Sequence, residues 1–270
     1  MKVSSWMTRD PLSIGPDASL EQALDLMDDR DFRHLPVVSG DRLEGIVSER
    51  DLLEALGRMP GSQAEEDLRT DRPGSVGEVA HRDVRTISLN EPLDAVAAVM
   101  SGLGIGCLPV VDDDRKLAGI VTEMDVLVLF RDLCRSGHLP PAADPEVVNR
   151  MSSGVLYVAP DTGLQDAFSV CLARHVRHLP VLDQGLLVGI VSDRDLRAAA
   201  TSSRPDPVVM SELMATEVET IEPEAKLSDA AARMAELKVT TLPVLRGDEV
   251  VGMISTSDVL VHCGEALAAV

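Results

Sequence analysis

The sequence predicts a mixed α/β fold built from four tandem copies of one unit of about sixty residues. Three observations predict it. A Leu-Pro-Val tripeptide occurs four times, an apolar set with helical spacing precedes each copy, and the pattern Gly-x-x-[Ser/Thr]-x-x-Asp follows each copy. Because internal self-similarity of this kind is typical of repeat architectures, each copy is expected to be one supersecondary unit.

Each unit is expected to begin with a short strand. Counting 22 residues back from the proline of each tripeptide reaches a β-branched residue, namely Ile14, Ile87, Val158 and Ile221. β-branched residues favour strands, and turn or helix-capping residues follow each of these anchors.

An amphipathic helix is expected next. A leucine six residues after each anchor opens an apolar set at i+3, i+4 and i+7. The four sets are Leu20, Ala23, Leu24 and Met27; Leu93, Val96, Ala97 and Met100; Leu164, Ala167, Phe168 and Cys171; and Leu227, Ala230, Ala231 and Met234. This spacing places all four members on one face of a helix, which would then pack on a core.

Two short β-rich runs separated by a polar turn follow each helix, as at residues 35–38 and 45–47. They predict a hairpin or two neighbouring strands. A second helix is expected to begin near Glu49, Glu123, Asp193 and Thr256. The unit is therefore predicted to run strand, helix, strand, strand, helix.

The four units are placed at residues 1–60, 74–135, 145–203 and 208–270, with polar segments at 57–77, 135–146 and 201–207 that all contain Pro and, in the first two, also Gly. Repeats one and three share Arg-His-Leu-Pro-Val, whereas repeats two and four share Asp-Val-Leu-Val. A unit this small buries little apolar surface and is expected to be only marginally stable alone. The alternation therefore predicts two modules, 1–143 and 144–270, each made of two paired repeats.

Composition limits the class of partner. Against 25 basic residues the chain has 45 acidic ones, so its net charge of -20 repels nucleic acid and anionic membranes. No signal-peptide pattern and no run of about 18 apolar residues is present, so we expect a cytoplasmic protein. The four cysteines form no C-x-x-C pair, which favours buried reduced thiols over disulfides or zinc.

The Gly-x-x-[Ser/Thr]-x-x-Asp pattern has two interpretations. It occurs as Gly45, Ser48 and Asp51; Gly119, Thr122 and Asp125; Gly189, Ser192 and Asp195; and Gly252, Ser255 and Asp258. In the first, hydroxyl and carboxylate cap the second helix. In the second, the glycine admits a ligand, the helix N-terminus attracts phosphate and the carboxylate accepts bonds from a ribose. Asp in place of the Glu or Gln usual in a capping box favours binding, although the two roles are compatible.

With these motifs together, the chain resembles the cystathionine-β-synthase (CBS) domain family, whose repeats pair into Bateman modules. The resemblance covers essentially the whole chain. It implies four β-α-β-β-α CBS repeats in two modules that form a pseudo-symmetric disc, similar in layout to the γ subunit of the AMP-activated kinase. It also implies clefts for AMP, ADP or ATP, with the Ser or Thr near phosphate and the Asp on ribose.

Clefts one and three are expected to bind best, because guanidinium and imidazole groups can offset the negative charge of the chain near a phosphate. The basic candidates are Arg33, His34, Arg50, Arg177, His178 and Arg194. Ser13, Thr86, Tyr157 and Thr220, which precede the strand anchors, complete the candidate set. Alternatively, the arginines belong to solvated helix faces paired with acids.

The expected function is that of a non-catalytic regulatory protein that senses adenine nucleotides and signals to a separate protein effector. No cofactor or metal is required, and a homodimer is left open. Hydrolase and nucleotide-hydrolysis motifs such as G-x-S-x-G and G-x-x-x-x-G-K-[ST] are absent from the sequence. The alternatives are a ligand-free structural or interaction scaffold, or a binder of another adenosyl ligand such as S-adenosylmethionine or a cyclic dinucleotide.

Overall fold

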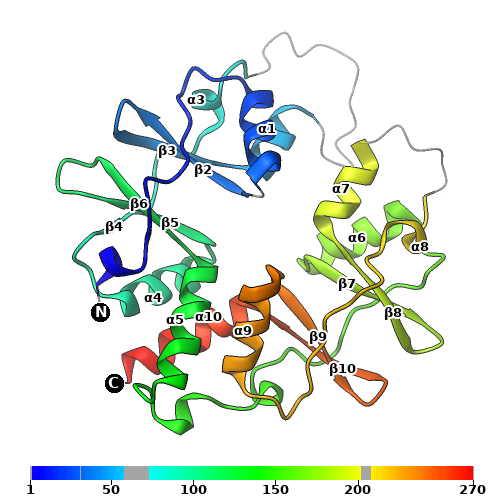
Figure 1. Cartoon of the computed structure of the whole chain (residues 1–270). Helices are drawn as coiled ribbons and strands as arrows, with labels where there is room; N and C mark the ends of the chain where they lie inside the picture. The colour runs from blue at the N-terminus through cyan, green and yellow to red at the C-terminus, as the bar shows by residue number, and fades with distance from the viewer. Residues whose placement is uncertain (1, 31, 58–72, 202–207, 270) are drawn as a thin grey trace. The chain divides into compact units, whose positions relative to one another are not determined.

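The computed structural model describes residues 2–30, 32–57, 73–201 and 208–269 (Figure 1). The chain divides into two compact units, Met1–Val126 and Leu127–Val270, and one helix continues across this boundary. The predicted segments at 57–77 and 201–207 lie largely outside the described residues, as do the predicted repeat ends at residues 60 and 203. The predicted repeat boundaries and the module boundary at residue 143 stay predictions.

The first unit contains the predicted order of helix, hairpin and second helix twice (Figure 1). Its elements are η1 (Val3–Ser5), β1 (Thr8–Arg9), α1 (Leu20–Arg30), β2 (His34–Ser39), β3 (Arg42–Ser48), α2 (Glu49–Ala55), α3 (Val76–Val79), β4 (Ile87–Ser88), α4 (Leu93–Leu103), β5 (Cys107–Val111), β6 (Leu117–Thr122) and α5 (Glu123–Arg135). Helix α5 is the one that crosses into the second unit.

The second unit repeats this order. Its elements are η2 (Pro141–Ala143), η3 (Val147–Asn149), α6 (Leu164–Arg174), β7 (His178–Asp183), β8 (Leu186–Ser192), α7 (Asp193–Thr201), α8 (Met210–Leu213), α9 (Leu227–Leu237), β9 (Thr241–Arg246), β10 (Glu249–Ser255) and α10 (Thr256–Ala268). No helix in the described part of the chain combines the length and apolar character that crossing a membrane requires.

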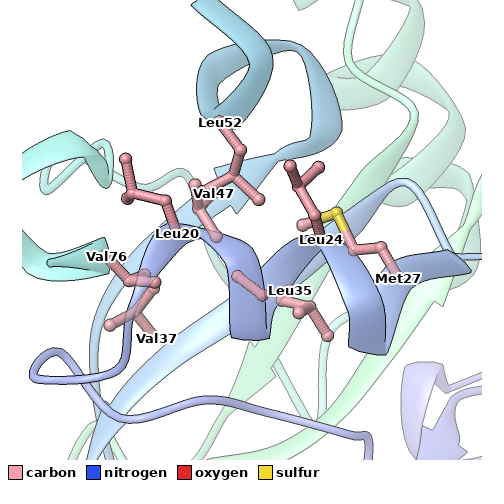
Figure 2. Close-up of a cluster of buried hydrophobic side chains, with 9 residues drawn as sticks. Leu20, Leu24, Met27, Leu35, Val37, Val47, Leu52 and Val76 are labelled. Carbon is pink, nitrogen blue, oxygen red and sulfur yellow. The ribbon is translucent and has the colours of Figure 1, made fainter. Parts of the chain in front are cut away.

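The predicted helices are confirmed. Helices α1, α4, α6 and α9 each begin at the predicted leucine, and α2, α5, α7 and α10 begin at the four predicted residues. The predicted apolar faces are buried, with the exception of Leu164, which is half-buried. Figure 2 shows the core of the first repeat, where Leu20, Leu24 and Met27 of α1 pack with Leu35 of β2 and Leu52 of α2.

The predicted hairpins are confirmed as antiparallel pairs: β2 with β3, β5 with β6, β7 with β8 and β9 with β10. The residue before each Leu-Pro-Val lies directly opposite the Ser or Thr of the downstream motif, as in His34 opposite Ser48 and His178 opposite Ser192. The Leu-Pro-Val tripeptide is therefore a core strand segment, and the hairpin brings the basic residue beside it to the start of the second helix.

The predicted first strand is correct only in the second repeat, where β4 pairs in parallel with β5. In the other three repeats the anchor forms a single parallel bridge to the Leu-Pro-Val strand. The residue two positions after the anchor explains the difference: it is Pro16, Pro160 or Pro223 in these repeats but Leu89 in the second. Proline has no N–H to donate to a sheet, so it ends the strand at once.

A feature that the sequence reasoning missed links the two repeats of each unit. Each repeat begins with a crossing segment, defined as residues 3–8, 76–81, 147–152 or 210–215, that docks on the other repeat of its unit. The first amide of each segment donates to the turn before the partner repeat's first helix; Val76, for example, donates to the Ala18 carbonyl at 2.9 Å. The last residue pairs with the partner hairpin just after its glycine, as His81 does with Ile46 and Ala215 with Ile190.

Candidate functional site

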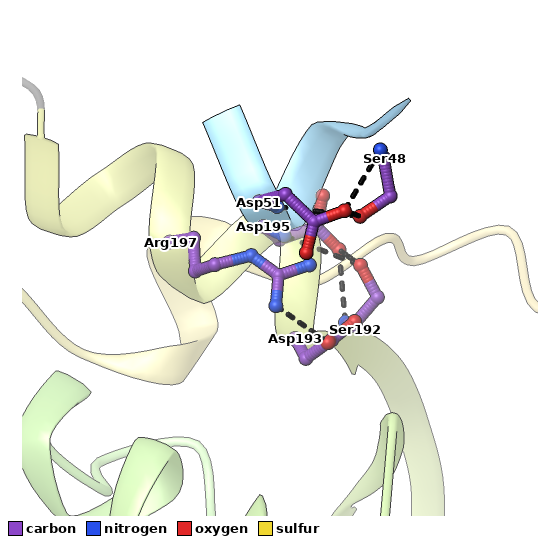
Figure 3. Close-up of polar contacts among 6 residues, drawn as sticks. All are labelled: Ser48, Asp51, Ser192, Asp193, Asp195 and Arg197. Carbon is purple, nitrogen blue, oxygen red and sulfur yellow. Dashed lines mark hydrogen bonds and ion pairs between the residues drawn. The ribbon is translucent and has the colours of Figure 1, made fainter. Parts of the chain in front are cut away.

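Each second helix begins with a closed ring of hydrogen bonds between its Ser or Thr and its Asp. In the first repeat the Asp51 Oδ2 accepts from the Ser48 amide at 2.9 Å and from the Ser48 hydroxyl at 2.6 Å. The Asp51 amide in turn lies 3.2 Å from the Ser48 Oγ. Figure 3 shows this arrangement, and the same arrangement of Ser192 with Asp195.

The other two repeats repeat this geometry, with Oδ2 distances of 2.7 Å to both the amide and the hydroxyl of Thr122 in the second, and 2.8 and 2.6 Å to those of Ser255 in the fourth. Asp in place of Glu or Gln therefore completes a capping box and does not by itself favour binding, contrary to what the sequence suggested. Asp at the third helical position reaches the amide and hydroxyl of the cap residue, so it satisfies groups that the first turn leaves without partners.

The motif glycines also have a different role from the one predicted. A Cβ at Gly45 would lie 3.0 Å from the His81 carbonyl oxygen and 3.1 Å from the Ala80 Cβ. At Gly189 it would overlap the side chain of Met214, and at Gly252 that of Met151. The missing side chain therefore makes room for the crossing segment of the partner repeat, rather than for a ligand.

Substitution of Gly119 by alanine should therefore loosen the first crossing segment. The added Cβ would lie 2.6 Å from the Met7 Sδ and 2.8 Å from the Thr8 carbonyl oxygen, and backbone moves less readily than a side chain. We expect a loss of about 1 to 3 kcal/mol in the free energy of unfolding, measured by chemical denaturation. Gly102→Ala, in α4 with nothing within 4 Å, is the control and should stabilise by about 0.5 to 1 kcal/mol. Equal effects in both variants would contradict this role.

The start of each second helix, with its Ser or Thr and its Asp, is called a junction and is numbered by its repeat. The second carboxylate oxygen of the Asp, Oδ1, determines which ligand groups a junction can still bind. In the first repeat the Asp51 Oδ1 lies 3.3 Å from the His81 Nε2. Within the described residues, the Oδ1 atoms of Asp125, Asp195 and Asp258 have no hydrogen-bond partner. A carboxylate oxygen at a helix N-terminus is an acceptor for a ligand hydroxyl, so the capping and binding roles are compatible.

Burial and charge set the ionisation of these groups. Burial raises the pKa of Asp51, but the hydrogen bonds from Ser48 and the charge of His81 outweigh it, so this pKa lies below its usual value. Burial raises the pKa of Asp125, and the hydrogen bonds from Thr122 only partly offset it, so this pKa lies above its usual value. Asp51 is thus an anion at neutral pH. Its stabilising effect is complete above a pH of about 4 and is lost as the pH falls through its lowered pKa.

The structure brings several predicted residues together at the first and third junctions. His34 and His178 are half-buried and face the capping serines across their hairpins. The carbonyls of Arg33 and Arg177 accept from the first amides of α2 and α7, which fixes both arginines beside the helix start with exposed side chains. Arg50 is exposed and Arg194 half-buried, each directly before the motif Asp.

The residues before the strand anchors differ in their exposure to solvent. Ser13, Thr86 and Thr220 are half-buried, whereas Tyr157 is 60% exposed. The sequence did not reveal the role of His81 beside Asp51. It also did not reveal the ion pair in α7, in which the Arg197 Nη1 lies 2.7 Å from the Asp193 Oδ2. The i,i+4 spacing was a signal for the ion pair. His81 would have been found by comparing the crossing segments.

Among the described residues, no group of three or more His, Cys, Asp or Glu side chains could hold a metal ion. His175 and His178 are three positions apart but belong to different elements: His175 caps α6 in the left-handed conformation and His178 begins β7.

The cysteine thiols are expected to resist modification in the folded protein. Burial, with a smaller contribution from Glu123, raises the pKa of Cys107 to about 12, and burial likewise raises the pKa of Cys134 and Cys263 to about 12 and of Cys171 to about 11. The reactive species is the thiolate, which is then scarce at pH 8. Titration with a thiol reagent should label all four cysteines in denaturant and label them far more slowly without it. Fast labelling of the native protein would contradict this.

Comparison with known proteins gives a consistent result. The CBS domain family model matches residues 3–58, 76–132, 146–202 and 210–265. The Methanocaldococcus jannaschii protein MJ1225 is 24% identical over 92% of this chain and 94% of its own length. The crystal structure of MJ1225, described as a candidate archaeal homologue of g-AMPK, has a TM-score of 0.77 at 23% identity and covers 96% of this chain and 99% of its own.

Two further matches extend the comparison. A Pyrococcus horikoshii structure has a TM-score of 0.68 at 26% identity, with 96% of this chain and 98% of that chain covered. The longer M. jannaschii protein MJ1404 is 25% identical over 97% of this chain, which spans only 62% of its length. The predicted fold of four repeats is confirmed by the four family matches and by the shared architecture.

Proposed function

We propose that this chain, which belongs to the CBS domain family, is a non-catalytic sensor that binds adenine nucleotides at the starts of its second helices and signals to a separate protein. One observation carries the proposal. At four equivalent helix N-termini the motif Asp uses its Oδ2 for the capping bonds, which leaves its Oδ1 directed away from the cap. At two of these helix N-termini, arginine and histidine flank the carboxylate.

Each group at these junctions has a role suited to a nucleotide. The helix N-terminus favours the negative charge of a phosphate. Arg33 and Arg50 in the first repeat, and Arg177 and Arg194 in the third, supply the local positive charge that a chain of net charge -20 otherwise lacks. The Oδ1 of Asp51 or Asp195 accepts a hydrogen bond from a ribose hydroxyl, while its Oδ2 maintains the cap.

The sensor mechanism requires that ligand binding change the geometry of a unit. The crossing segments already join the two repeats of each unit, so a ligand held at one junction acts on a structure shared by both repeats. A ligand shifts such an equilibrium only by its difference in affinity for the two states, typically about 1 to 3 kcal/mol.

Isothermal titration with AMP, ADP and ATP tests the proposal. We expect saturable binding of at least one nucleotide, with up to two strong sites per chain. The control ligand is ribose 5-phosphate, which retains the phosphate and sugar contacts but lacks the base. Absence of heat at millimolar concentrations of all three nucleotides would overturn the proposal.

A second candidate function, that of a ligand-free scaffold, has one observation in its favour: all four capping boxes are complete without any ligand. Under that alternative, Asp and Ser serve the fold alone. Native mass spectrometry of protein purified without added nucleotide separates the two, because a sensor is expected to retain a bound small-molecule mass in part of the population. The same spectrum reports the number of subunits.

A further inference from the structure

The first and third junctions are equivalent in sequence and in backbone, but the crossing segment that covers each of them ends in a different residue. His81 pairs with Ile46 beside the first junction, and Ala215 pairs with Ile190 beside the third. Both pairs have the same two backbone hydrogen bonds, with distances of 2.9 and 3.0 Å in each case. The Cβ atoms at positions 81 and 215 are therefore equivalently placed.

Only the histidine reaches the carboxylate. The His81 Nε2 lies 3.3 Å from the Asp51 Oδ1, which is the oxygen that the capping box leaves over. Asp51 is 23% exposed as a side chain, whereas Asp195 beside Ala215 belongs to the exposed residues. The remaining crossing segments end in Thr8 and Ser152, so the first junction is the one with an ionisable group at this position.

We propose that His81 is a specificity-determining residue of the first junction, where it occupies the Asp51 Oδ1 and competes with a ribose hydroxyl for that oxygen. This inference rests on the proposed function and deepens it. A nucleotide at the first junction must displace the imidazole, whereas one at the third meets an open oxygen. Because His81 belongs to the second repeat and Asp51 to the first, that displacement moves a side chain of one repeat when ligand binds the other.

The size of the effect follows from the exposure of the contact. The His81 side chain is 69% exposed, and exposed ion pairs contribute little, which corresponds to a factor of about two to five in affinity. His81→Ala should strengthen AMP binding at the first junction by that factor. Ala215→His should weaken AMP binding at the third junction by a similar factor, since it places an imidazole beside Asp195.

The experiment is an AMP titration of the full chain and of these two variants, followed by NMR at the backbone amides of Ser48 and Ser192. These amides donate to Asp51 and Asp195, so each reports on its own junction. Both substitutions lie on exposed residues and leave the capping boxes intact, so folding is expected to be preserved. Each variant is also the control for the other, because the junction it does not change should keep its affinity.

Each variant is expected to change the affinity of one junction only. In His81→Ala the AMP affinity reported by the Ser48 amide increases, and in Ala215→His the AMP affinity reported by the Ser192 amide decreases. The same titrations with 2′,3′-dideoxy-AMP, which has no ribose hydroxyl to compete with His81, should show no difference in affinity between either variant and the unmodified chain. Unchanged or weaker binding at Ser48 in His81→Ala, with AMP still bound, overturns the role of His81 and leaves the proposed function standing. If AMP, ADP and ATP each shift neither amide in the unmodified chain, both the proposed function and this inference fall.

Discussion

Replacing Leu35 with alanine is expected to lower the free energy of unfolding by about 2 to 5 kcal/mol. Leu35 is the leucine of the first Leu-Pro-Val tripeptide and has 0% exposure. It packs with Leu24, Met27 and Leu52, which come from both helices of the repeat (Figure 2). Its truncation removes buried contacts and leaves a cavity that neighbours on regular elements cannot easily fill. Chemical denaturation followed by circular dichroism measures the loss.

Leu12→Ala is the matched control for this experiment. Leu12 is 38% exposed, so the same change of side chain should cost far less. The comparison tests whether the repeated tripeptide belongs to the fold or to the site. If Leu35→Ala loses stability no more than Leu12→Ala, the tripeptide does not have the core role assigned to it.

The paired variant Asp51→Ala with Asp195→Ala should weaken nucleotide binding by about 1 to 3 kcal/mol at each site. It removes the carboxylate that accepts from the ribose, and also one capping box from α2 and one from α7. Loss of each cap costs about 0.5 to 2 kcal/mol of stability, so the effect on binding must be separated from the effect on folding. Isothermal titration and denaturation of the same preparation give both quantities.

The control pair is Asp125→Ala with Asp258→Ala. It breaks the two other capping boxes, which have the same hydrogen bonds, in repeats that lack the flanking arginines. Both pairs should lose similar stability, but only the first should lose most of its nucleotide affinity. Equal affinities in the two pairs would contradict the assignment of the ligand to the first and third junctions.

The helices could be predicted from the sequence because their signals are local. Four apolar residues at helical spacing begin at Leu20, Leu93, Leu164 and Leu227, and the helices begin at the same residues. Likewise, Ser48 and Asp51 are three positions apart at a strand-to-helix junction, which is itself a sufficient signal for a cap. A short-range pattern needs no knowledge of what lies beyond it.

Two of the errors share a physical cause, which is contact between distant parts of the chain. Gly45 correctly indicated that something approaches the backbone closely, but a glycine does not identify what approaches, and the answer lies at residues 80–81. The same holds for His81, because its role depends on a contact with the carboxylate of Asp51, thirty residues earlier in the chain. The error on the first strand has a local cause, because Pro16, Pro160 and Pro223 cannot donate to a sheet and leave a single bridge at each anchor.

The reciprocal docking of the crossing segments has a consequence for biosynthesis. During synthesis, the hairpin of the first repeat leaves the ribosome before residues 76–81. These residues later cover Gly45 and form the backbone hydrogen bonds with Ile46. Residues 3–8 emerge before β6, with which the end of this segment pairs. Because a single repeat lacks the contacts that the crossing segment of its partner supplies, we expect the two repeats of the first unit to complete their folding together, after both have been translated.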